Sequence, residues 1–210
     1  MAGHDQHRAL ANKIRLAVEE CIPTYFERSA ARTALQAKIE AVLAEPPPEV
    51  QPATRQVTIL LADIRGLNAL TQTYAAPVIM ELLNRYFAAM SDTIVRFGGS
   101  IDKFMGDSIM VLFGAPCSEP DDTERAIACA VAMQQAMSEY NRQNMELGLP
   151  ELYMGIGLNS GKVVAGALGS EHHRQYTVIG NEVSLASRIE AQSLRGQVLL
   201  SENCYHCLLY

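Results

Sequence analysis

Two aspartates stand where predicted strands end, and together they could hold a divalent metal ion. Asp63 follows the apolar run 57–62, which is typical of a strand covered on both faces. Asp107 lies in a Gly-Asp turn that joins two further predicted strands, 100–105 and 108–113. If this hairpin lies beside the first strand, the two carboxylates meet at one edge of a sheet. Two carboxylates are a normal protein contribution to Mg²⁺, which takes its other ligands from water and substrate phosphates. The pair therefore indicates a nucleoside triphosphate site, although either aspartate alone could equally be an ordinary turn residue.

Three sequence blocks, two of which contain these aspartates, resemble the signature of a known enzyme family. The blocks are LLADIRGL at 60–67, SIDKFMGDSIMVLFG at 100–114 and QYTVIGNEVSLASRIE at 175–190. In this order they resemble the class III adenylate and guanylate cyclase catalytic domain, and three ordered blocks are far more specific than one. The resemblance covers residues 55–210 and implies an α+β fold of the ferredoxin-like, palm type, with a mostly antiparallel sheet flanked by helices. It also implies an enzyme of signal transduction that converts ATP to 3′,5′-cyclic AMP and pyrophosphate.

The resemblance assigns the metal site to the first two blocks. It implies two divalent ions, Mg²⁺ or Mn²⁺, held by Asp63, Asp107 and the backbone carbonyl of Ile64. Such ions would activate the ribose 3′-hydroxyl for attack on the α-phosphorus while pyrophosphate leaves. In the family the aspartates come from one subunit and the base-reading residues from the other, so a homodimer is implied.

The turn after Asp63 is the expected phosphate contact. Backbone N–H groups at residues 65–67, near a predicted helix start, are suited to phosphate oxygens. The sequence departs here from the family's commoner Gly-Phe-Thr, and we expect Asn68 to cap the helix. Substrate contacts are therefore expected at Gly66, Leu67 and Asn68.

Lys103 and Thr177 match the two positions that read the purine in this family. Adenine offers an acceptor at N1 and donors at its amino group, so a lysine next to a hydroxyl acceptor selects adenine. A guanylate cyclase would be expected to carry an acidic residue and a small Cys or Ser instead. Threonine in place of the commoner aspartate resembles the subgroup that includes bicarbonate-responsive cyclases. Without its flanking block, Lys103 would be read as one exposed strand lysine among many.

The third block contains one match and one departure. Arg188 matches the arginine that contacts the triphosphate, whereas Ser184 stands where the family usually has a catalytic asparagine. The chain also ends at Tyr210, before a second phosphate-binding lysine of the family, so the catalytic domain is expected to be incomplete at its C-terminus. These departures leave a low-activity regulatory or dimerisation module as an alternative, beside a guanylate cyclase. A diguanylate-cyclase-like enzyme is disfavoured because its GGDEF-type block is absent.

Composition narrows the class of protein further. A net charge of -6 and a pI near 5.4 argue against a nucleic-acid binder, which would carry a basic patch. No apolar run approaches the length of a membrane span and the N-terminus lacks a signal-peptide pattern, so we expect a cytoplasmic protein, although a longer parent chain could be membrane-attached. Five scattered cysteines fit a reducing compartment. Cys204 and Cys207 are expected to face the core from a short helix rather than to bind zinc, because no second ligand pair lies nearby.

The elements that must position these residues follow from the apolar periodicity. Residues 1–54 read as two helices, 10–20 and 30–44, and a proline-rich linker, and they could carry an upstream regulatory signal or simply pack on the flank of the domain. Residues 55–210 form the expected catalytic domain. Its further predicted helices cover 72–97, 120–141 and 182–191, and its further predicted strands cover 152–159, 162–167, 176–179 and 197–200, the first two of these strands forming a hairpin turned at Gly161.

Overall fold

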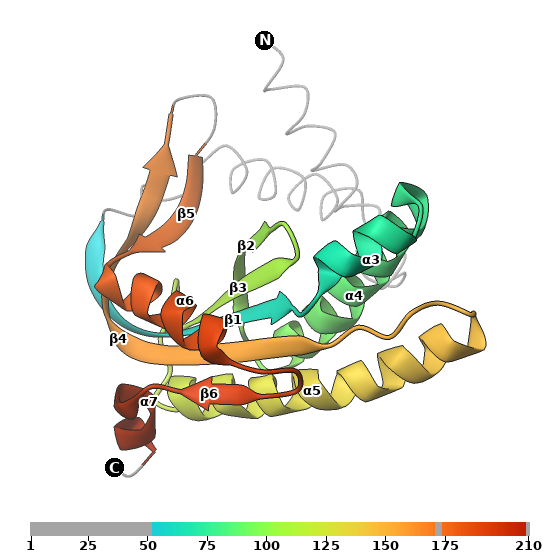
Figure 1. Ribbon diagram of the computed structural model, residues 1–210. Helices are drawn as coiled ribbons and strands as arrows, with labels where there is room; N and C mark the ends of the chain where they lie inside the picture. The colour runs from blue at the N-terminus through green and yellow to red at the C-terminus, as the bar shows by residue number, and fades with distance from the viewer. Residues whose placement is uncertain (1–51, 171–173, 209–210) are drawn as a thin grey trace, which may run out of the picture. The chain divides into compact units, whose positions relative to one another are not determined.

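The computed structural model describes residues 52–170 and 174–208 (Figure 1). The chain divides into two compact units, Met1–Val50 and Gln51–Tyr210. The predicted helices at 10–20 and 30–44 lie outside the described residues. In chain order the described elements are β1 (Ala53–Ile64), α3 (Leu67–Thr73), α4 (Ala76–Arg96), β2 (Ser100–Met105), β3 (Ser108–Phe113), α5 (Asp122–Glu146), β4 (Met154–Gly169), β5 (Arg174–Ile179), α6 (Asn181–Gln192), β6 (Val198–Leu200) and α7 (Glu202–Cys207).

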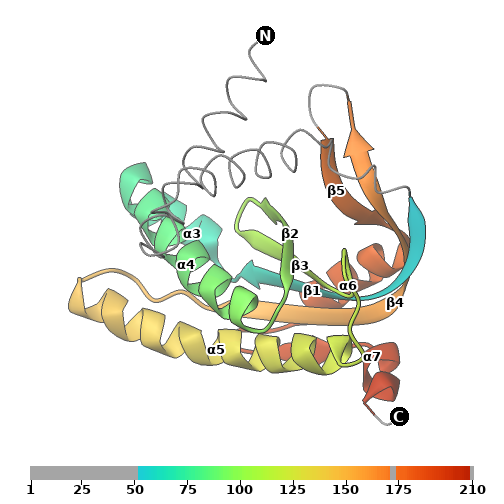
Figure 2. The same cartoon turned by 180° about the vertical axis from the view of Figure 1, so that it is seen from behind.

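The strands of the described residues form one sheet in the order β2-β3-β1-β4-β5, with β6 added on β4. All pairs along this order are antiparallel, and only the β4–β6 pair is parallel. Helices cover both faces of the sheet, as Figures 1 and 2 show. The predicted α+β fold with a mostly antiparallel sheet flanked by helices is therefore confirmed.

Strand β1 is buried on both faces because it alternates between two apolar clusters. Leu60, Ala62 and Ile64 pack with the α4 and α5 side chains, among them Tyr86 and Met133. The residues between them on β1 point to the opposite face, where Val57, Ile59 and Leu61 pack with Ala186 of α6. Two-sided burial explains the nearly continuous apolar run that predicted this strand.

The predicted hairpin at 100–113 is confirmed, with β2 and β3 at the predicted bounds. Gly106 supplies the positive φ, 65°, that the tight turn requires.

The predicted hairpin turn at Gly161 is wrong, because β4 is one continuous strand of 16 residues. It pairs with β1 without interruption from Ala53↔Ala165 to Ile64↔Met154. A Cβ on Gly161 would lie 2.7 Å from the Glu182 side chain. The glycine therefore serves the close approach of α6 to the strand and not a turn.

The predicted helix at 72–97 is two helices, α3 and α4, separated by extended backbone at Tyr74 and Ala75. Pro77 explains the break, since it lacks an N–H and its ring would collide with the preceding helical turn. Helix α5 runs on to Glu146, beyond the predicted end at 141.

The short C-terminal helix is present as α7, but its two cysteines differ. Cys204 is buried and Cys207 is exposed, so only the first faces the core. Within the described ranges no group of His, Cys, Asp and Glu has the size of a metal-binding cluster, and no helix is long and apolar enough to span a membrane.

Candidate active site

The structure brings Asp63 and Asp107 to one edge of the sheet. Asp63 is the penultimate residue of β1, and Asp107 lies in the turn before β3, which pairs with β1 up to Ala62↔Ile109. The Ser108 hydroxyl donates to Asp63 Oδ1 at 2.5 Å and so ties the hairpin to the end of β1. Burial raises the pKa of the Asp107 carboxyl, and the negative charge of Asp63 adds to the rise. The two carboxylates therefore lie near enough for the charge of Asp63 to act on Asp107.

Arg65 forms a network at this site that the sequence did not predict. Its Nη1 lies 3.2 Å from Asp63 Oδ2, and its Nη2 donates to the carboxylate of Glu190, to the Glu190 backbone oxygen at 2.6 Å and to Ser193 Oγ at 2.8 Å. Gly155 leaves room for this network, since a Cβ there would lie 2.1 Å from Ser193 Oγ. The guanidinium thus joins the end of β1 to the C-terminal half of α6.

Glu190 is a third carboxylate close to the aspartate pair. Burial raises the pKa of its carboxyl, the charges of Asp63 and Asp107 add to the rise, and Arg65 opposes it. Glu190 is therefore held by the guanidinium, whereas Asp107 has no such cation in direct contact among the described residues.

The donor set fits Mg²⁺ or Mn²⁺ bound together with a nucleotide. Asp63 already accepts hydrogen bonds from Arg65 and Ser108, but an ionised carboxylate offers about four lone-pair sites and keeps acceptor capacity. Two carboxylates leave most of an octahedral shell to water and phosphate oxygens, which is how proteins usually hold Mg²⁺ with a substrate. Ile64, the third predicted ligand, is the last residue of β1, and its side chain is buried in the core.

The loop after β1 has fewer free backbone N–H groups for a phosphate than predicted. Arg65 N–H donates to the Tyr153 carbonyl at 2.7 Å and is not available to a phosphate. Gly66, with φ 83°, is the residue before α3, and Leu67 begins that helix. The prediction that Asn68 caps the helix is wrong, because Asn68 lies inside α3 and the cap position makes no side-chain hydrogen bond.

Lys103 and Thr177 lie together although they come from the two end strands of the sheet. Lys103 Nζ on β2 donates to Thr177 Oγ1 on β5 at 3.1 Å. Asp102, which the sequence did not single out, joins them with its carboxylate 3.1 Å from Lys103 Nζ. The pair is therefore assembled within one chain.

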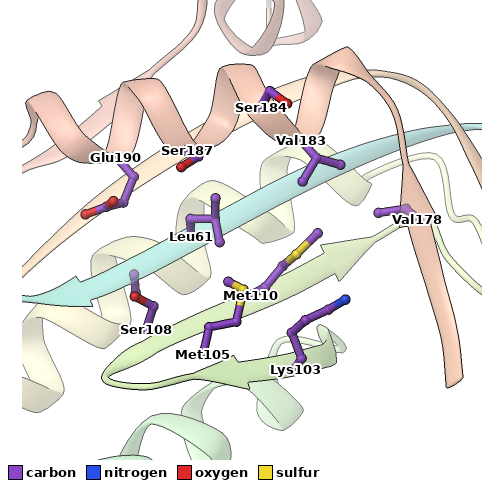
Figure 3. A pocket seen from close by; sticks show the side chains of 11 residues that line it. Leu61, Lys103, Met105, Ser108, Met110, Val178, Val183, Ser184, Ser187 and Glu190 are labelled. Atoms are coloured by element: carbon purple, nitrogen blue, oxygen red, sulfur yellow. The ribbon is translucent and has the colours of Figure 1, made fainter. Parts of the chain in front are cut away.

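A cavity of about 420 Å³ opens beside Lys103, between the β2–β3 hairpin and α6 (Figure 3). Its apolar part includes Leu61, Met110 and Val178, while Lys103 stands across from the α6 residues Ser184 and Ser187. Ser108 and Glu190, which contact the Asp63 network, line it as well. The residues that line it are Leu61, Ala62, Lys103, Met105, Ser108, Met110, Val178, Val183, Ser184, Ser187 and Glu190. The cavity can hold an apolar ring with one polar edge toward Lys103.

Arg188 does not join the other predicted residues. It is exposed on α6, does not line the cavity, and makes no hydrogen bond or ion pair to a residue that the structure describes. The described chain alone therefore gathers the aspartate pair and the Lys103–Thr177 pair, and leaves Arg188 facing solvent.

Comparisons with known proteins agree on one family. The model of the adenylate and guanylate cyclase catalytic domain matches residues 49–209. An adenylate cyclase of Anabaena cylindrica is 40% identical over 142 residues, 66% of this chain and 27% of that protein. Adenylate cyclase 1 of Rhizobium meliloti is 29% identical over 139 residues, 66% of this chain and 21% of that protein. The chain thus spans about a quarter of the length of these relatives.

Two solved structures share the fold. The adenylyl cyclase CyaB from P. aeruginosa superposes with a TM-score of 0.74 at 34% identity, covering 76% of this chain and 83% of that one. The guanylyl cyclase Cya2 superposes with a TM-score of 0.73 at 45% identity, covering 74% of this chain and 79% of that one.

Proposed function

Because this chain belongs to the adenylate and guanylate cyclase catalytic domain family, we propose that it is an adenylate cyclase that converts ATP to 3′,5′-cyclic AMP and pyrophosphate. The observation that carries the choice of ATP is the hydrogen bond between Lys103 Nζ and Thr177 Oγ1 beside the cavity. An ammonium group donates to adenine N1, and a hydroxyl oxygen accepts from the adenine amino group. The adenylate cyclases among the relatives support the same choice.

GTP is the second candidate substrate, because a structure 45% identical to this chain is titled a guanylyl cyclase. Guanine presents an acceptor at O6 and a donor at N1, the reverse of adenine. Lys103 would face the N1–H donor with another donor, which disfavours guanine at this site.

Asp63, Asp107 and the backbone carbonyl of Ile64 are the groups that would hold two Mg²⁺ or Mn²⁺ ions. When bound, such ions lower the pKa of the ribose 3′-hydroxyl and offset the charge of the triphosphate. Asp107 suits this role, since burial and the nearby Asp63 charge raise the pKa of its carboxyl, and a bound cation would offset both effects.

The reaction forms a bond between the ribose 3′-oxygen and the α-phosphorus and breaks the bond from that phosphorus to pyrophosphate, and the 3′-hydroxyl proton is released. The apolar side of the cavity holds the adenine ring and Lys103 orients its edge. Gly66 and Leu67 offer backbone N–H groups to the phosphates. Arg188 balances the charge that develops on the triphosphate, and Ser184 takes the place next to the ribose where the family usually has asparagine.

We further propose that two copies of the chain share each site, with Asp63 and Asp107 from one copy and Lys103, Thr177 and Arg188 from the other. The exposed position of Arg188, away from its own cavity, supports a role toward a partner. Exposed apolar side chains on the β2–β3 and β4–β5 hairpins give a second copy a surface to cover, namely Phe104, Met105, Val164, Leu168 and Ile179.

The activity is tested by incubating the purified chain with ATP or GTP and Mn²⁺ or Mg²⁺ and identifying the products by mass spectrometry. Cyclic AMP from ATP, with much slower turnover of GTP, is the expected result. Equal or faster turnover of GTP would reject the ATP assignment. Nucleotide binding without any product would favour the regulatory module that Ser184 suggests.

The shared site is tested by mixing two inactive variants, Asp63→Ala and Arg188→Ala, at equal amounts under conditions of free exchange. Half of the dimers should be mixed and each mixed dimer has one intact site, so activity should return to roughly a quarter of the unaltered level. A tag on one variant confirms that mixed dimers form. Background activity in proven mixed dimers would show that each site belongs to a single chain.

A further inference from the structure

Strand β2 contains a bulge at Asp102. Ile101 pairs with Val111 and Lys103 with Met110, so Asp102 has no partner on β3. Successive side chains on a regular strand point to opposite faces, but a bulge breaks this alternation. Asp102 and Lys103 can therefore both reach the same residue, Thr177.

The three side chains form a closed set of polar contacts. Thr177 Oγ1 donates to Asp102 Oδ2 at 3.0 Å, Lys103 Nζ lies 3.1 Å from the same oxygen, and Lys103 Nζ donates to Thr177 Oγ1 at 3.1 Å. Gln175, also on β5, donates to the Asp102 backbone oxygen at 2.5 Å. These contacts hold the two end strands of the sheet against each other.

Asp102 is placed where an ionised carboxylate is costly. Its side chain is 1% exposed, and its Oδ1 is buried with no hydrogen-bond partner among the described residues. A buried carboxylate is retained at such a position only with a partner for its charge, which here is Lys103. This arrangement calls for a role besides stability.

That role is to determine whether the Thr177 hydroxyl donates or accepts a hydrogen bond. A threonine hydroxyl has one hydrogen and two lone pairs, so on its own it can donate to a guanine O6 or accept from an adenine amino group. Ionised Asp102 can only accept, and it takes the hydroxyl hydrogen. Thr177 is then left with lone pairs alone, one of which accepts from Lys103.

The hydrogen-bond capacity that remains matches adenine. Lys103 has three N–H donors, and its contacts with Asp102 and Thr177 use two of them. The third can donate to adenine N1, and the second lone pair of Thr177 can accept from the adenine amino group. Guanine would present an acceptor to the Thr177 lone pair and a donor to the Lys103 donor, so both contacts would repel.

We propose that Asp102 is a specificity-determining residue, which makes Thr177 a pure acceptor and thereby excludes guanine. Asp102 is a positioning residue, since it acts through Thr177 and Lys103. The bulge lets a carboxylate on β2 supply the negative charge that an aspartate at position 177 would supply directly. The inference rests on the proposed adenylate cyclase function.

The test compares Asp102→Asn with the unaltered chain by the ratio of kcat/KM for ATP to that for GTP, and by the ratio of dissociation constants for non-reacting analogues of the two nucleotides. Asparagine keeps the size of the side chain but removes the charge and can itself donate, so Thr177 is free to turn. Both ratios should fall about ten- to hundredfold, the range for one misdirected hydrogen bond. Unchanged ratios in the folded variant would overturn the inference.

Two further variants separate polarity from structure. Gln175→Ala removes a hydrogen bond to the Asp102 backbone and so loosens the contact between β2 and β5, but it leaves the side chains of Asp102, Lys103 and Thr177 unaltered. The ratios should therefore stay unchanged, and an equal fall would mean that Asp102 acts only through strand packing. The double variant Asp102→Asn/Thr177→Asp moves the carboxylate to position 177 and keeps a partner for Lys103. The double variant should restore the preference for ATP. If Asp102→Asn alone does not fold, the double variant serves as the test, and a loss of the ATP preference in it would overturn the inference.

The nucleotide preference of the unaltered chain separates a failure of this inference from a failure of the proposed function. If the unaltered chain prefers GTP or turns over neither nucleotide, the proposed function is wrong and the role of Asp102 is rejected with it. If it prefers ATP and the Asp102 variants keep that preference, only the role of Asp102 is wrong.

Discussion

Replacing Gly157 by alanine should displace α6 from the sheet and weaken the site without altering any residue in it. Gly157 lies in β4, between Leu61 of β1 and Leu199 of β6. A Cβ at this position would lie 2.3 Å from the Glu190 backbone nitrogen and 2.5 Å from its Cα. Carbon atoms pack at about 3.5–4.0 Å, so α6 would have to retreat by about 1 Å or more.

The expected loss of stability follows from the kind of atoms that collide. Overpacking costs about 1–3 kcal/mol, and the upper end applies because the colliding atoms belong to the helix backbone and cannot rotate away. The shift also strains the contacts of Arg65 with Glu190. We therefore expect about 3 kcal/mol, which for a domain of this size lowers Tm by about 6–12 °C. Urea unfolding measures this loss in the free energy of unfolding, and the m-value should stay unchanged.

Gly161→Ala is the matched control on the same strand. Its Cβ would meet the outer part of the Glu182 side chain at 2.7 Å, and that side chain can move aside at the expense of one hydrogen bond from Asn159. We expect a loss of about 1 kcal/mol. Turnover of Gly157→Ala should also fall at a temperature at which the variant remains folded, because α6 carries Ser184 and Arg188. If Gly157→Ala were as mild as Gly161→Ala, the close packing of α6 on β4 would be refuted.

Three shorter predictions address the residues themselves. Asp107→Asn should abolish turnover yet leave Tm of the metal-free protein unchanged or higher. Burial and the Asp63 charge raise the pKa of Asp107, so its carboxylate costs the folded state free energy that a neutral amide would not; a clear drop in Tm would contradict this. Ser184→Asn should raise kcat if serine is a poor substitute for the family's asparagine, and an equal or lower kcat would mean that the site works with serine by another route. Of the cysteines in the described residues, a thiol reagent at pH 8 should label the exposed pair and spare the buried pair until the protein unfolds, since burial raises the pKa of Cys129 to about 12. Mass spectrometry of the labelled peptides identifies Cys117 and Cys207 as expected, and early labelling of Cys129 or Cys204 would contradict the packing.

The sequence correctly predicted those elements whose bounds depend on neighbouring residues only. The β2–β3 hairpin was predicted to the residue because a Gly-Asp turn between two short apolar strands specifies both its ends. Strand β4 was predicted as a hairpin because Gly161 reads as a turn. The glycines of β4 are explained only by the packing of α6, since a Cβ at Gly157 or Gly161 would collide with that helix. Glycine marks close packing and turns alike, and the sequence does not say which.

The sequence indicated individual residues of the candidate site, but not the contacts between them. The motif positions Asp63, Asp107, Lys103 and Thr177 could be marked in advance, because each lies in a block with a recognisable order. Their partners could not, since Arg65 reaches Glu190 across 125 residues of chain and Asp102 reaches Thr177 across 75. Contacts of that separation depend on how the strands pair and bend, which no local pattern encodes.

The two halves of the proposed site depend on different parts of the fold. The aspartate pair needs only the β1–β3 pairing and the turn before β3, so neighbouring strands suffice to build it. The triad of Asp102, Lys103 and Thr177 instead joins β2 to β5, which stand at opposite ends of the strand order. Figures 1 and 2 show the β2–β3 and β4–β5 hairpins rising on the same side of β1, which brings these end strands within reach of each other.

In the proposed function, nucleotide selection therefore depends on the curvature of the whole sheet, whereas metal binding does not. A change that flattens β4 would separate Thr177 from Asp102 and Lys103 while it leaves Asp63 and Asp107 side by side. Such a chain would keep the proposed metal site and lose the proposed preference for adenine. The bulge at Asp102 and the continuous bend of β4, visible in Figure 1, would thus be functional parts of the proposed site, although neither of them is a group that touches the reacting atoms.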